Sequence, residues 1–457
     1  MFITNIVIVG GGKLGSMIAR ALVKENHNVG VIDTDSDALL KLDDTDVLQF
    51  LGSGVSMTTL AEAEVKNADI LIATTKSDEI NMICCFLAKG LGVRYTVARV
   101  RDPEYLSSTA FLTREMKIDF VANPERATAR EISRMLRLPF AVSIETFAKG
   151  LVEMVEMRVD GDEPFIGIPL NQLYSIKKQM PHVLFCGVKR GNDAFIPKGN
   201  SMIHEGDSLF VTADYATMTA FFRYIGKNTK APKDAMIIGG SRIAFYLADI
   251  LSESGMKTKI IEQDEDKARR IAESLKDSVV LQGDGTDQEL LLSEGLKTCE
   301  SFIALTDRDE ENLMAGLYAA KEGCGKVIVK SNRTNYTEML TAMGMNGIIS
   351  PSQIARNIIL RAVRARVAGG GSIERMYSIM EGQAEALEFI AKGNADYLGI
   401  PLSKLTIDKD SLIAVIVRNN KASVPFGADT IEEGDHVVVI TKQKGISSLS
   451  DVVRYDS

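Results

Sequence analysis

Three glycines near the start of the chain have the spacing that a dinucleotide phosphate requires. Gly10, Gly12 and Gly15 stand at the glycine positions of G-x-G-x-x-G, directly after an apolar, β-branched run. In that motif the first glycine makes a tight turn, the second lets the backbone approach a pyrophosphate, and the third lets a helix pack on the strand. The phosphates would bind the N–H groups at the helix N-terminus. The motif predicts a nucleotide site in which Lys13 and Leu14 also take part.

An acidic residue follows at the spacing expected for ribose recognition. The apolar run 29–32 ends in Asp33, 23 positions after Gly10. An acid at this place accepts hydrogen bonds from the hydroxyls of an adenosine ribose and repels a 2′-phosphate. A glycine turn that binds nothing is the alternative interpretation. The flanking strand, helix and acid favour nucleotide binding, with NAD(H) as the expected ligand.

The elements around the motif follow the pattern of a doubly wound sheet. Helical spacings of apolar residues alternate with apolar runs that predict strands, at 6–9, 29–32, 47–51, 69–74, 95–100 and 119–122. Ligands of such sheets lie at the carboxyl ends of the strands, so Thr74, Thr75 and Arg99 are candidate nucleotide contacts. A surface ion pair is the alternative for Arg99. The segment 78–81 (Asp-Glu-Ile-Asn) opens a helix, where the dipole alone favours acids, so a purely structural role is one interpretation. A place in the nucleotide cleft is the other, and the recurrence of the segment at 309–312 favours it.

Composition narrows the class of protein. The chain has 457 residues, 45% of them apolar, and a formal charge of −8, which gives no overall indication of nucleic-acid binding. No apolar run approaches the roughly 20 residues that cross a bilayer, so we expect a cytoplasmic protein. The five cysteines and four histidines have neither disulfide nor metal-ligand spacing, so we expect no metal site and no catalytic residue among them.

The chain contains an internal duplication. Gly239 stands 229 positions after Gly10 and again follows an apolar run, and the same spacing takes Asp33 to Glu262. The Asp-Glu-x-Asn pattern of the first unit recurs in the second. Motifs that repeat in type and order over such a length indicate two copies of one structural unit.

A smaller segment with short strands and Gly-Asp turns follows each copy. Gly-Ile-Pro-Leu occurs at 167–170 and again at 399–402, and Glu-Gly-Asp recurs after it in both places. We therefore predict an α/β chain with two Rossmann-like doubly wound parallel sheets, each followed by a small, β-rich α+β domain. The expected boundaries and linkers are 1–138, 139–228, 229–366 and 367–457, joined near 226–233 and 369–372.

The order of these motifs resembles that of tandem domains that regulate potassium conductance (RCK domains). Over nearly the whole chain the arrangement is similar to the TrkA family, cytosolic subunits of the Trk potassium-uptake system. The resemblance implies a non-enzymatic, homo-oligomeric and ring-forming subunit. It would gate a TrkH-like membrane potassium transporter subunit in response to NAD(H) and to ATP or ADP. The resemblance also implies a cytoplasmic location, peripheral on the inner face of the membrane through that partner.

The second copy departs from the glycine motif. Ser241 occupies the middle position and places a Cβ where backbone would meet a pyrophosphate, while Arg242 beside it could reach a phosphate. Ala244 in place of the third glycine is a tolerated change, and Glu262 still suits a ribose. Asp284, in Gly-Asp-Gly, keeps an acid that is frequent in the family and that the first copy lacks. We expect NAD(H) chiefly in the first copy, and ATP, ADP or nothing in the second.

Two helices rich in arginine are candidates for assembly. The helices expected after Pro124 and Pro351 carry apolar residues such as Ile132 and Ile359 beside their arginines. A nucleic-acid-binding stripe is one interpretation. In the family this is a crossover helix that forms a dimer, so we expect both helices to pack on another subunit.

Two other functions compete with a regulatory role. An NAD-dependent oxidoreductase would use the same glycine motif, but no histidine, lysine or cysteine has a recognisable catalytic setting. A transcription factor that senses NADH would need a DNA-binding element, and the acidic chain has no convincing helix-turn-helix.

Overall fold

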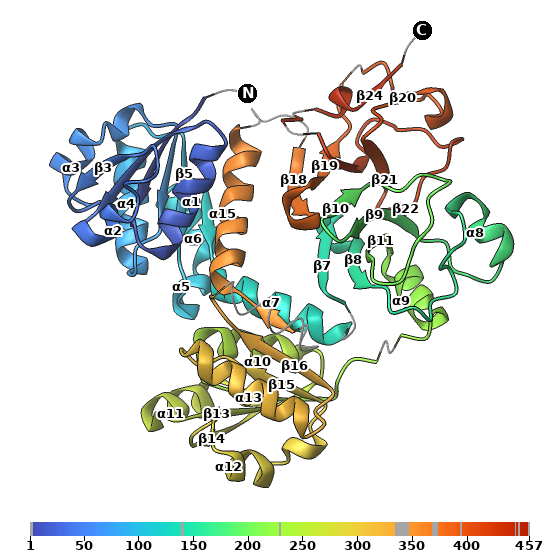
Figure 1. The fold of residues 1–457 in the computed structure, drawn as a ribbon. Helices are drawn as coiled ribbons and strands as arrows, with labels where there is room; N and C mark the ends of the chain where they lie inside the picture. The colour runs from blue at the N-terminus through green and yellow to red at the C-terminus, as the bar shows by residue number, and fades with distance from the viewer. Residues whose placement is uncertain are drawn as a thin grey trace. The chain divides into compact units, whose positions relative to one another are not determined.

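The computed structural model describes residues 3–138, 141–227, 230–333, 347–367, 373–393, 395–443, 445–446 and 448–455 (Figure 1). The expected linker at 369–372, and residues 228–229 of the other, lie outside these described residues. The chain forms two compact units, each built from two separate segments. The Rossmann pair comprises Met1–Leu136 and Pro232–Val367, and the small-domain pair comprises Arg137–Ala231 and Ala368–Ser457.

The first Rossmann domain is a six-stranded parallel sheet in the order β3-β2-β1-β4-β5-β6. Its strands are β1 (Asn5–Val9), β2 (Asn28–Asp33), β3 (Leu48–Leu51), β4 (Ile70–Ala73), β5 (Tyr95–Arg99) and β6 (Phe120–Ala122). Its helices are α1 (Lys13–Lys24), α2 (Ser36–Leu40), α3 (Met57–Glu62), α4 (Asp78–Gly90), α5 (Pro103–Ser107) and α6 (Thr109–Glu115). The order reverses between β1 and β4, where ligands bind in such sheets.

The central strand β1 is continuously apolar because cores lie on both faces of the sheet. Ile6 and Ile8 belong to one core, and Val7 and Val9 belong to the other. Side chains alternate between the two faces along a strand, so a strand buried on both sides needs apolar residues at every position.

The second Rossmann domain repeats this topology in the order β14-β13-β12-β15-β16-β17. Its strands are β12 (Asp234–Ile238), β13 (Lys257–Glu262), β14 (Ser278–Gln282), β15 (Ser301–Ala304), β16 (Lys326–Lys330) and β17 (Ile348–Ile349). Its helices are α10 (Arg242–Glu253), α11 (Glu265–Ser274), α12 (Gln288–Ser293) and α13 (Asp309–Lys321). The predicted pair of doubly wound parallel sheets is confirmed.

The two Rossmann domains exchange their last helices. Helix α7 (Pro124–Arg137) follows the first sheet, but its Ile132 lies in one core with Ile237 and Leu247 of the second domain. Helix α15 (Pro351–Val367) follows the second sheet, and its Ile359 lies in a core of the first domain. The expectation that these helices pack on another subunit is therefore wrong. The duplication supplies the partner within the same chain.

The small-domain pair contains two five-stranded antiparallel sheets, in the orders β10-β9-β11-β8-β7 and β18-β19-β23-β21-β22. The strands of the first sheet are β7 (Ser143–Phe147), β8 (Val152–Arg158), β9 (Leu184–Arg190), β10 (Asp193–Phe195) and β11 (Ser208–Asp214). Those of the second are β18 (Ile373–Ile379), β19 (Ala384–Ile390), β21 (Ser411–Arg418), β22 (Lys421–Ser423) and β23 (His436–Thr441). The other elements are α8 (Leu170–Ile176), α9 (Tyr215–Tyr224), and the paired strands β20 (Thr406–Ile407) and β24 (Val453–Arg454). A β-rich domain thus follows each Rossmann domain, as predicted.

The repeated Glu-Gly-Asp motif has a structural explanation in these domains. The buried carboxylate of Asp207 accepts the N–H of His204 at 2.9 Å and binds the guanidinium of Arg190. Asp435 accepts the N–H of Glu432 at 2.8 Å and binds Arg418 in the same way. The motif fixes one tight turn in each small domain.

Within the described part of the chain, every helix is too short or too polar to cross a membrane.

Candidate functional site

The first glycine turn is held by contacts that leave no room for side chains at two positions. Gly10 has a φ of +103°, and a Cβ there would lie 2.9 Å from the backbone nitrogen of Thr75. A Cβ on Gly15 would lie 1.8 Å from the carbonyl oxygen of Gly10. Both glycines are required by the packing of strand, turn and helix on one another.

Gly12 differs from Gly10 and Gly15, because the packing of the fold does not require a glycine at this position. A Cβ built on Gly12 meets no atom of the described chain within 4 Å, and its φ of −60° suits any residue. The position caps the N-terminus of α1, where backbone N–H groups are unpaired. Open space at a helix N-terminus is what a phosphate group needs in order to approach the backbone.

Asp33 lies directly beside this turn. Its Oδ2 accepts the N–H of Gly11 at 2.5 Å, and its Oδ1 accepts the N–H of Asp35 at 2.9 Å. A carboxylate has about four acceptor positions, so two remain for ribose hydroxyls. Gly11 was not singled out from the sequence, although its N–H orients the acid.

The two threonines at the end of β4 hold the turn in place. Thr74 is buried, with Oγ1 3.3 Å from the carbonyl oxygen of Gly10. Thr75 N–H donates to Oδ1 of Asn81 at 2.8 Å, and Thr75 Oγ1 lies 2.7 Å from the same oxygen. Their hydroxyls thus have partners within the protein, where the glycine turn meets the end of β4.

The repeated Asp-Glu-x-Asn segment ties neighbouring strand ends together. Asn81 is fully buried and donates to the carbonyl oxygen of Arg99 at 2.8 Å, which links β4 to β5. In the second domain Asn312 accepts from Thr306 N–H at 2.9 Å and donates to the carbonyl oxygen of Lys330 at 3.1 Å. The recurrence of this segment therefore has a structural cause in both domains.

Arg99 lies at the carboxyl end of β5 beneath the first turn of α7. Its Nη2 is 3.3 Å from Oε1 of Glu125, and burial lowers the pKa of Arg99. Its Nε and the second oxygen of Glu125 are buried without a hydrogen-bond partner in the described structure. Arg99 is therefore only partly paired, whereas Arg101 is bound to Asp78 at 2.9 Å.

In the second glycine turn a side chain of the protein already accepts one of the N–H groups at the helix N-terminus. Oγ of Ser241 accepts the N–H of Ala244 at 3.3 Å, and the Ser241 N–H donates to the carbonyl oxygen of Gly239 at 2.9 Å. Ala244 is the counterpart of Gly15, where a Cβ would lie 1.8 Å from the carbonyl oxygen of Gly10. Because the second turn accommodates the Ala244 Cβ, its backbone follows a different path from that of the first turn.

Glu262 is more fully paired than Asp33. Its Oε2 accepts the N–H of Gly240 at 2.6 Å and lies 3.0 Å from Nζ of Lys267, and its Oε1 accepts the N–H of Asp264. Burial alone would raise the pKa of Glu262, but the Asp264 N–H and the Lys267 ammonium hold it below its ordinary value. A ribose would have to compete with Lys267.

The basic residues that follow the two turns reach the opposite Rossmann domain. Nζ of Lys13 donates to the carbonyl oxygen of Asn332 at 3.2 Å, and Nη2 of Arg242 lies 3.4 Å from Oδ2 of Asp102. Tyr246 also donates across the boundary, to the carbonyl oxygen of Arg101 at 2.8 Å. Each turn is therefore linked to the loop after the fifth strand of the other domain. No local pattern of residues predicts these links.

Two other predicted contacts have local partners. Leu14 is buried in a core of the first domain, so only its backbone could contact a ligand. Oδ1 of Asp284 accepts the N–H of Thr286 at 2.8 Å and its hydroxyl at 2.7 Å, and these bonds lower the pKa of Asp284.

Comparison with known proteins defines the class to which this fold and site belong. A TrkA-N domain model matches residues 6–124 and 235–351, and a TrkA-C domain model matches residues 154–226 and 387–454. Trk system potassium uptake protein TrkA homolog 2 of Methanosarcina mazei is 30% identical over 456 residues, which cover 98% of this chain and 99% of that protein. Trk system potassium uptake protein TrkA of Halomonas elongata is 30% identical over 448 residues, or 96% of each chain.

Solved structures support the same fold. The GsuK RCK domain aligns with a TM-score of 0.62 at 19% identity and covers 96% of this chain and 92% of that one. The GsuK channel bound to NAD aligns with a TM-score of 0.63 at 19% identity and covers 96% of this chain and 77% of that one. Fold and site together define a tandem protein in which a Rossmann-type TrkA-N domain precedes a TrkA-C domain twice. The chain belongs to the TrkA family.

Proposed function

We propose that the chain is a nucleotide-binding regulatory subunit of a membrane potassium-uptake system, with NAD(H) bound in the first Rossmann domain. The observation that carries this proposal is the contrast among the three glycines. Gly10 and Gly15 are fixed by internal packing, whereas Gly12 faces open space beside the carboxylate of Asp33. A glycine that the fold does not need, at a helix N-terminus next to a ribose acceptor, suits the pyrophosphate of a dinucleotide.

The residues of the first domain fit NAD(H) by their chemistry. Backbone N–H groups after Gly12 would hold the pyrophosphate and Asp33 would accept the ribose hydroxyls, while the partly exposed guanidinium of Arg99 would add positive charge at the carboxyl end of β5. One related structure, the GsuK channel, is bound to NAD. The bound cofactor would act as a signal, and none of the residues described here is assigned a catalytic step.

The second domain would bind an adenine mononucleotide such as ATP or ADP, or nothing. Ser241 stands at the position of Gly12 and already accepts the N–H of Ala244, and Lys267 already pairs with Glu262. A GsuK structure bound to ADP is among those with a similar fold. Unequal occupancy would let one chain respond to two signals.

Regulation would work through the boundary between the Rossmann domains. Lys13 contacts Asn332 and Arg242 contacts Asp102, so each turn senses the opposite domain. A nucleotide shifts a conformational equilibrium only by binding one arrangement better than another. Contacts that change when a phosphate enters the turn would provide that difference in affinity.

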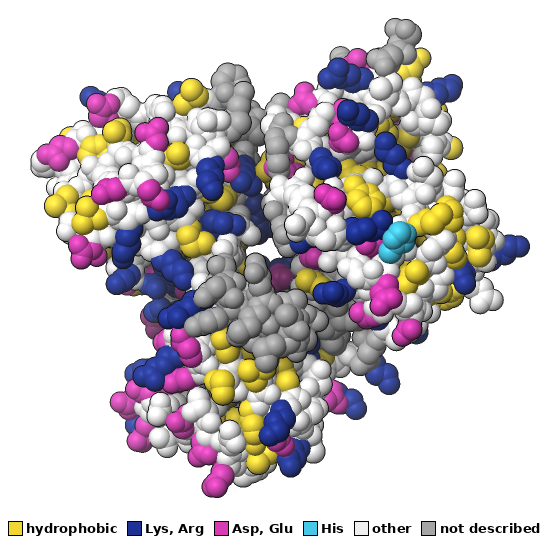
Figure 2. Space-filling view, in the orientation of Figure 1, with side chains coloured by type: hydrophobic (Ala, Val, Ile, Leu, Met, Phe, Trp, Pro, Cys, Tyr) yellow, Lys and Arg dark blue, Asp and Glu magenta, His cyan; other side chains and the backbone are white. Residues whose placement is uncertain are grey.

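We also propose that copies of the chain assemble and act on a TrkH-like membrane potassium transporter subunit. Ile83 and Phe86 on α4, and Met314 on α13, are exposed apolar residues. Helices α4 and α13 pack in other cores than the exchanged helices do. Figure 2 shows hydrophobic side chains on the surface of the second Rossmann domain. The relatives' names place them in the Trk potassium-uptake system, which supports a membrane partner.

Deletion of the gene from its own organism tests this function. Rubidium uptake under potassium limitation should fall, and the wild-type chain, but not a folded Asp33→Ala variant, should restore it. Unchanged uptake in the deletion strain would contradict the proposal. Sustained oxidation of NADH by the purified chain with a carbonyl substrate would instead favour an oxidoreductase. The intact chain is needed, because α7 and α15 each complete the core of the other domain.

A further inference from the structure

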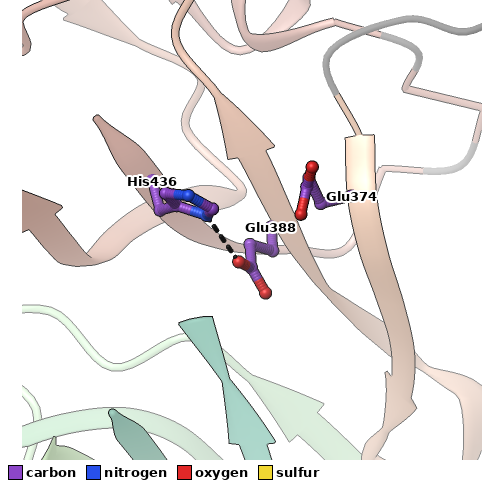
Figure 3. Close-up of side chains that lie close together, drawn as sticks. All are labelled: Glu374, Glu388 and His436. Atoms are coloured by element: carbon purple, nitrogen blue, oxygen red, sulfur yellow. Dashed lines mark hydrogen bonds and ion pairs between the residues drawn. The ribbon is translucent and has the colours of Figure 1, made fainter. Parts of the chain in front are cut away.

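Three potential metal ligands meet in the second small domain. Glu374 lies on β18, Glu388 on β19 and His436 at the start of β23 (Figure 3). One ligand atom from each residue lies within 4.8 Å of the other two. Among the described residues, this is the group of three that could hold a metal ion.

The pairing of the strands explains how these distant residues come together. Glu388 pairs with Val438 and Ile390 pairs with His436, so Glu388 and His436 are diagonal neighbours on one face of the sheet. On the other side of β19, Arg375 pairs with Glu388 while Ile373 pairs with Phe389, which leaves Glu374 as the extra residue of a β-bulge. A bulge redirects a side chain, and here it brings the Glu374 carboxylate to the cluster.

Glu388 is held in one orientation. Its side chain is 1% exposed, and its Oε2 accepts the N–H of Ala148 at 3.0 Å, with Nε of Arg375 at 3.8 Å from the same oxygen. Its Oε1 is thereby directed toward Nδ1 of His436 at 2.8 Å. A second group that fixes a ligating carboxylate is typical of metal sites. Glu374 is exposed, so the cluster is open to ions from solvent.

A buried ion pair between Glu388 and His436 is the simpler interpretation. Comparison with the first small domain indicates that the fold does not require these three residues. Its counterpart of Glu388 is Glu156, but Val142 and Ser208 stand where Glu374 and His436 would be. The same sheet thus forms without two of the three ligands, and their presence in the second domain calls for another explanation.

The ligand set indicates which ion would bind. One imidazole nitrogen with two carboxylate oxygens is suited to Zn²⁺ and similar first-row ions. Ca²⁺ and Mg²⁺ prefer oxygen ligands alone. We propose that Glu374, Glu388 and His436 bind a divalent transition-metal ion, with Zn²⁺ as the representative and a fourth position open to water. The ion would replace the hydrogen bond between Glu388 and His436 and connect β18, β19 and β23.

Calorimetric titration of the intact, metal-stripped chain with Zn²⁺ tests this site. The wild type should bind one Zn²⁺ per chain, and excess Mg²⁺ or Ca²⁺ should not displace it. Glu374→Gln and His436→Ala should each weaken binding at least about tenfold, since even the loss of a group that only supports a ligand has an effect of that size. Glu388 is left unchanged because its burial makes it important for folding.

Matched controls keep the test decisive. His204→Ala and Glu433→Gln remove an exposed histidine and an exposed acid outside the cluster, and both should retain wild-type Zn²⁺ affinity. Circular dichroism would establish that each variant is folded, and the exposed Glu374 makes Glu374→Gln the safer variant if His436→Ala does not fold. The absence of saturable Zn²⁺ binding, unchanged affinity in Glu374→Gln, or an equal loss in His204→Ala would overturn the proposal.

Discussion

Substitution of Gly12 should weaken NADH binding and leave the fold stable, whereas substitution of Gly15 should lower the stability of the fold. Gly12→Ser gives the first turn the residue that the second turn has at Ser241. Nothing lies within 4 Å of the new Cβ, and serine is a favourable N-cap, so the free energy of unfolding should change by only a few tenths of a kcal/mol. Gly15→Ala instead places a Cβ 1.8 Å from the carbonyl oxygen of Gly10. Overpacking of this kind lowers stability by about 1–3 kcal/mol.

Although Gly12→Ser should remain stable, it should bind NADH more weakly than the wild type. The Gly12→Ser side chain would stand between the helix N-terminus and the pyrophosphate. The loss of hydrogen bonds to a charged group costs about 1.5–3 kcal/mol. The NADH dissociation constant should therefore rise about 10- to 150-fold while the fold is retained.

Urea denaturation and NADH calorimetry on the two variants measure both quantities. A Gly12→Ser variant as unstable as Gly15→Ala would mean that the middle glycine has a packing role. Unchanged NADH affinity in Gly12→Ser would mean that the dinucleotide does not approach this position. Either result would refute the interpretation of the open space at Gly12.

Three further predictions concern stability. Ile359→Ala should lower the free energy of unfolding by about 2–5 kcal/mol, because Ile359 is fully buried in a core of the first domain; an unchanged urea midpoint would contradict the helix exchange. Asn81→Ala should lower the free energy of unfolding by about 1–3 kcal/mol, since the Thr75 N–H and the Arg99 carbonyl lose a buried partner. An unchanged urea midpoint would contradict the role of Asn81 in linking β4 to β5. Burial lowers the pKa of Lys326 from 10.5 to about 8. Between these two pH values the lysine is protonated in the unfolded chain but not in the folded one. The free energy of unfolding should therefore rise with pH in this range, by up to about 1.4 kcal/mol per pH unit. Lys326→Met should therefore be more stable than wild type at pH 7, with a difference that shrinks above pH 8 in denaturation curves; a difference independent of pH would contradict the assignment.

Local pattern was sufficient to predict both sheets and the glycine turns. The alternate burial of Ile6 and Val7 in two cores is what a continuous apolar run encodes. Local pattern could not predict the exchange of α7 and α15. The apolar stripe of α7, with Ile132 fully buried, specifies that this face is covered but not by which sheet. That choice depends on contacts between segments more than a hundred residues apart.

The candidate site divides in the same way. Spacing alone predicted Gly10, Gly12 and Asp33 as candidate nucleotide contacts, because motif and secondary structure are local. The cross-domain contacts of Lys13 and Arg242 depend on how the two Rossmann domains pack within their pair. The histidines had no metal-ligand spacing in the sequence, yet the strand register brings His436 to two glutamates.

The central claim is that the first Rossmann domain binds NAD(H) through Gly12 and Asp33. Parallel titrations of the intact chain with NADH and NADPH test it most directly. We expect saturable NADH binding, much weaker NADPH binding, and a loss of about 1–3 kcal/mol of NADH affinity in Asp33→Ala. The matched variant Glu262→Ala should retain NADH affinity. Equal affinity for NADH and NADPH, or a loss in Glu262→Ala with none in Asp33→Ala, would contradict the account.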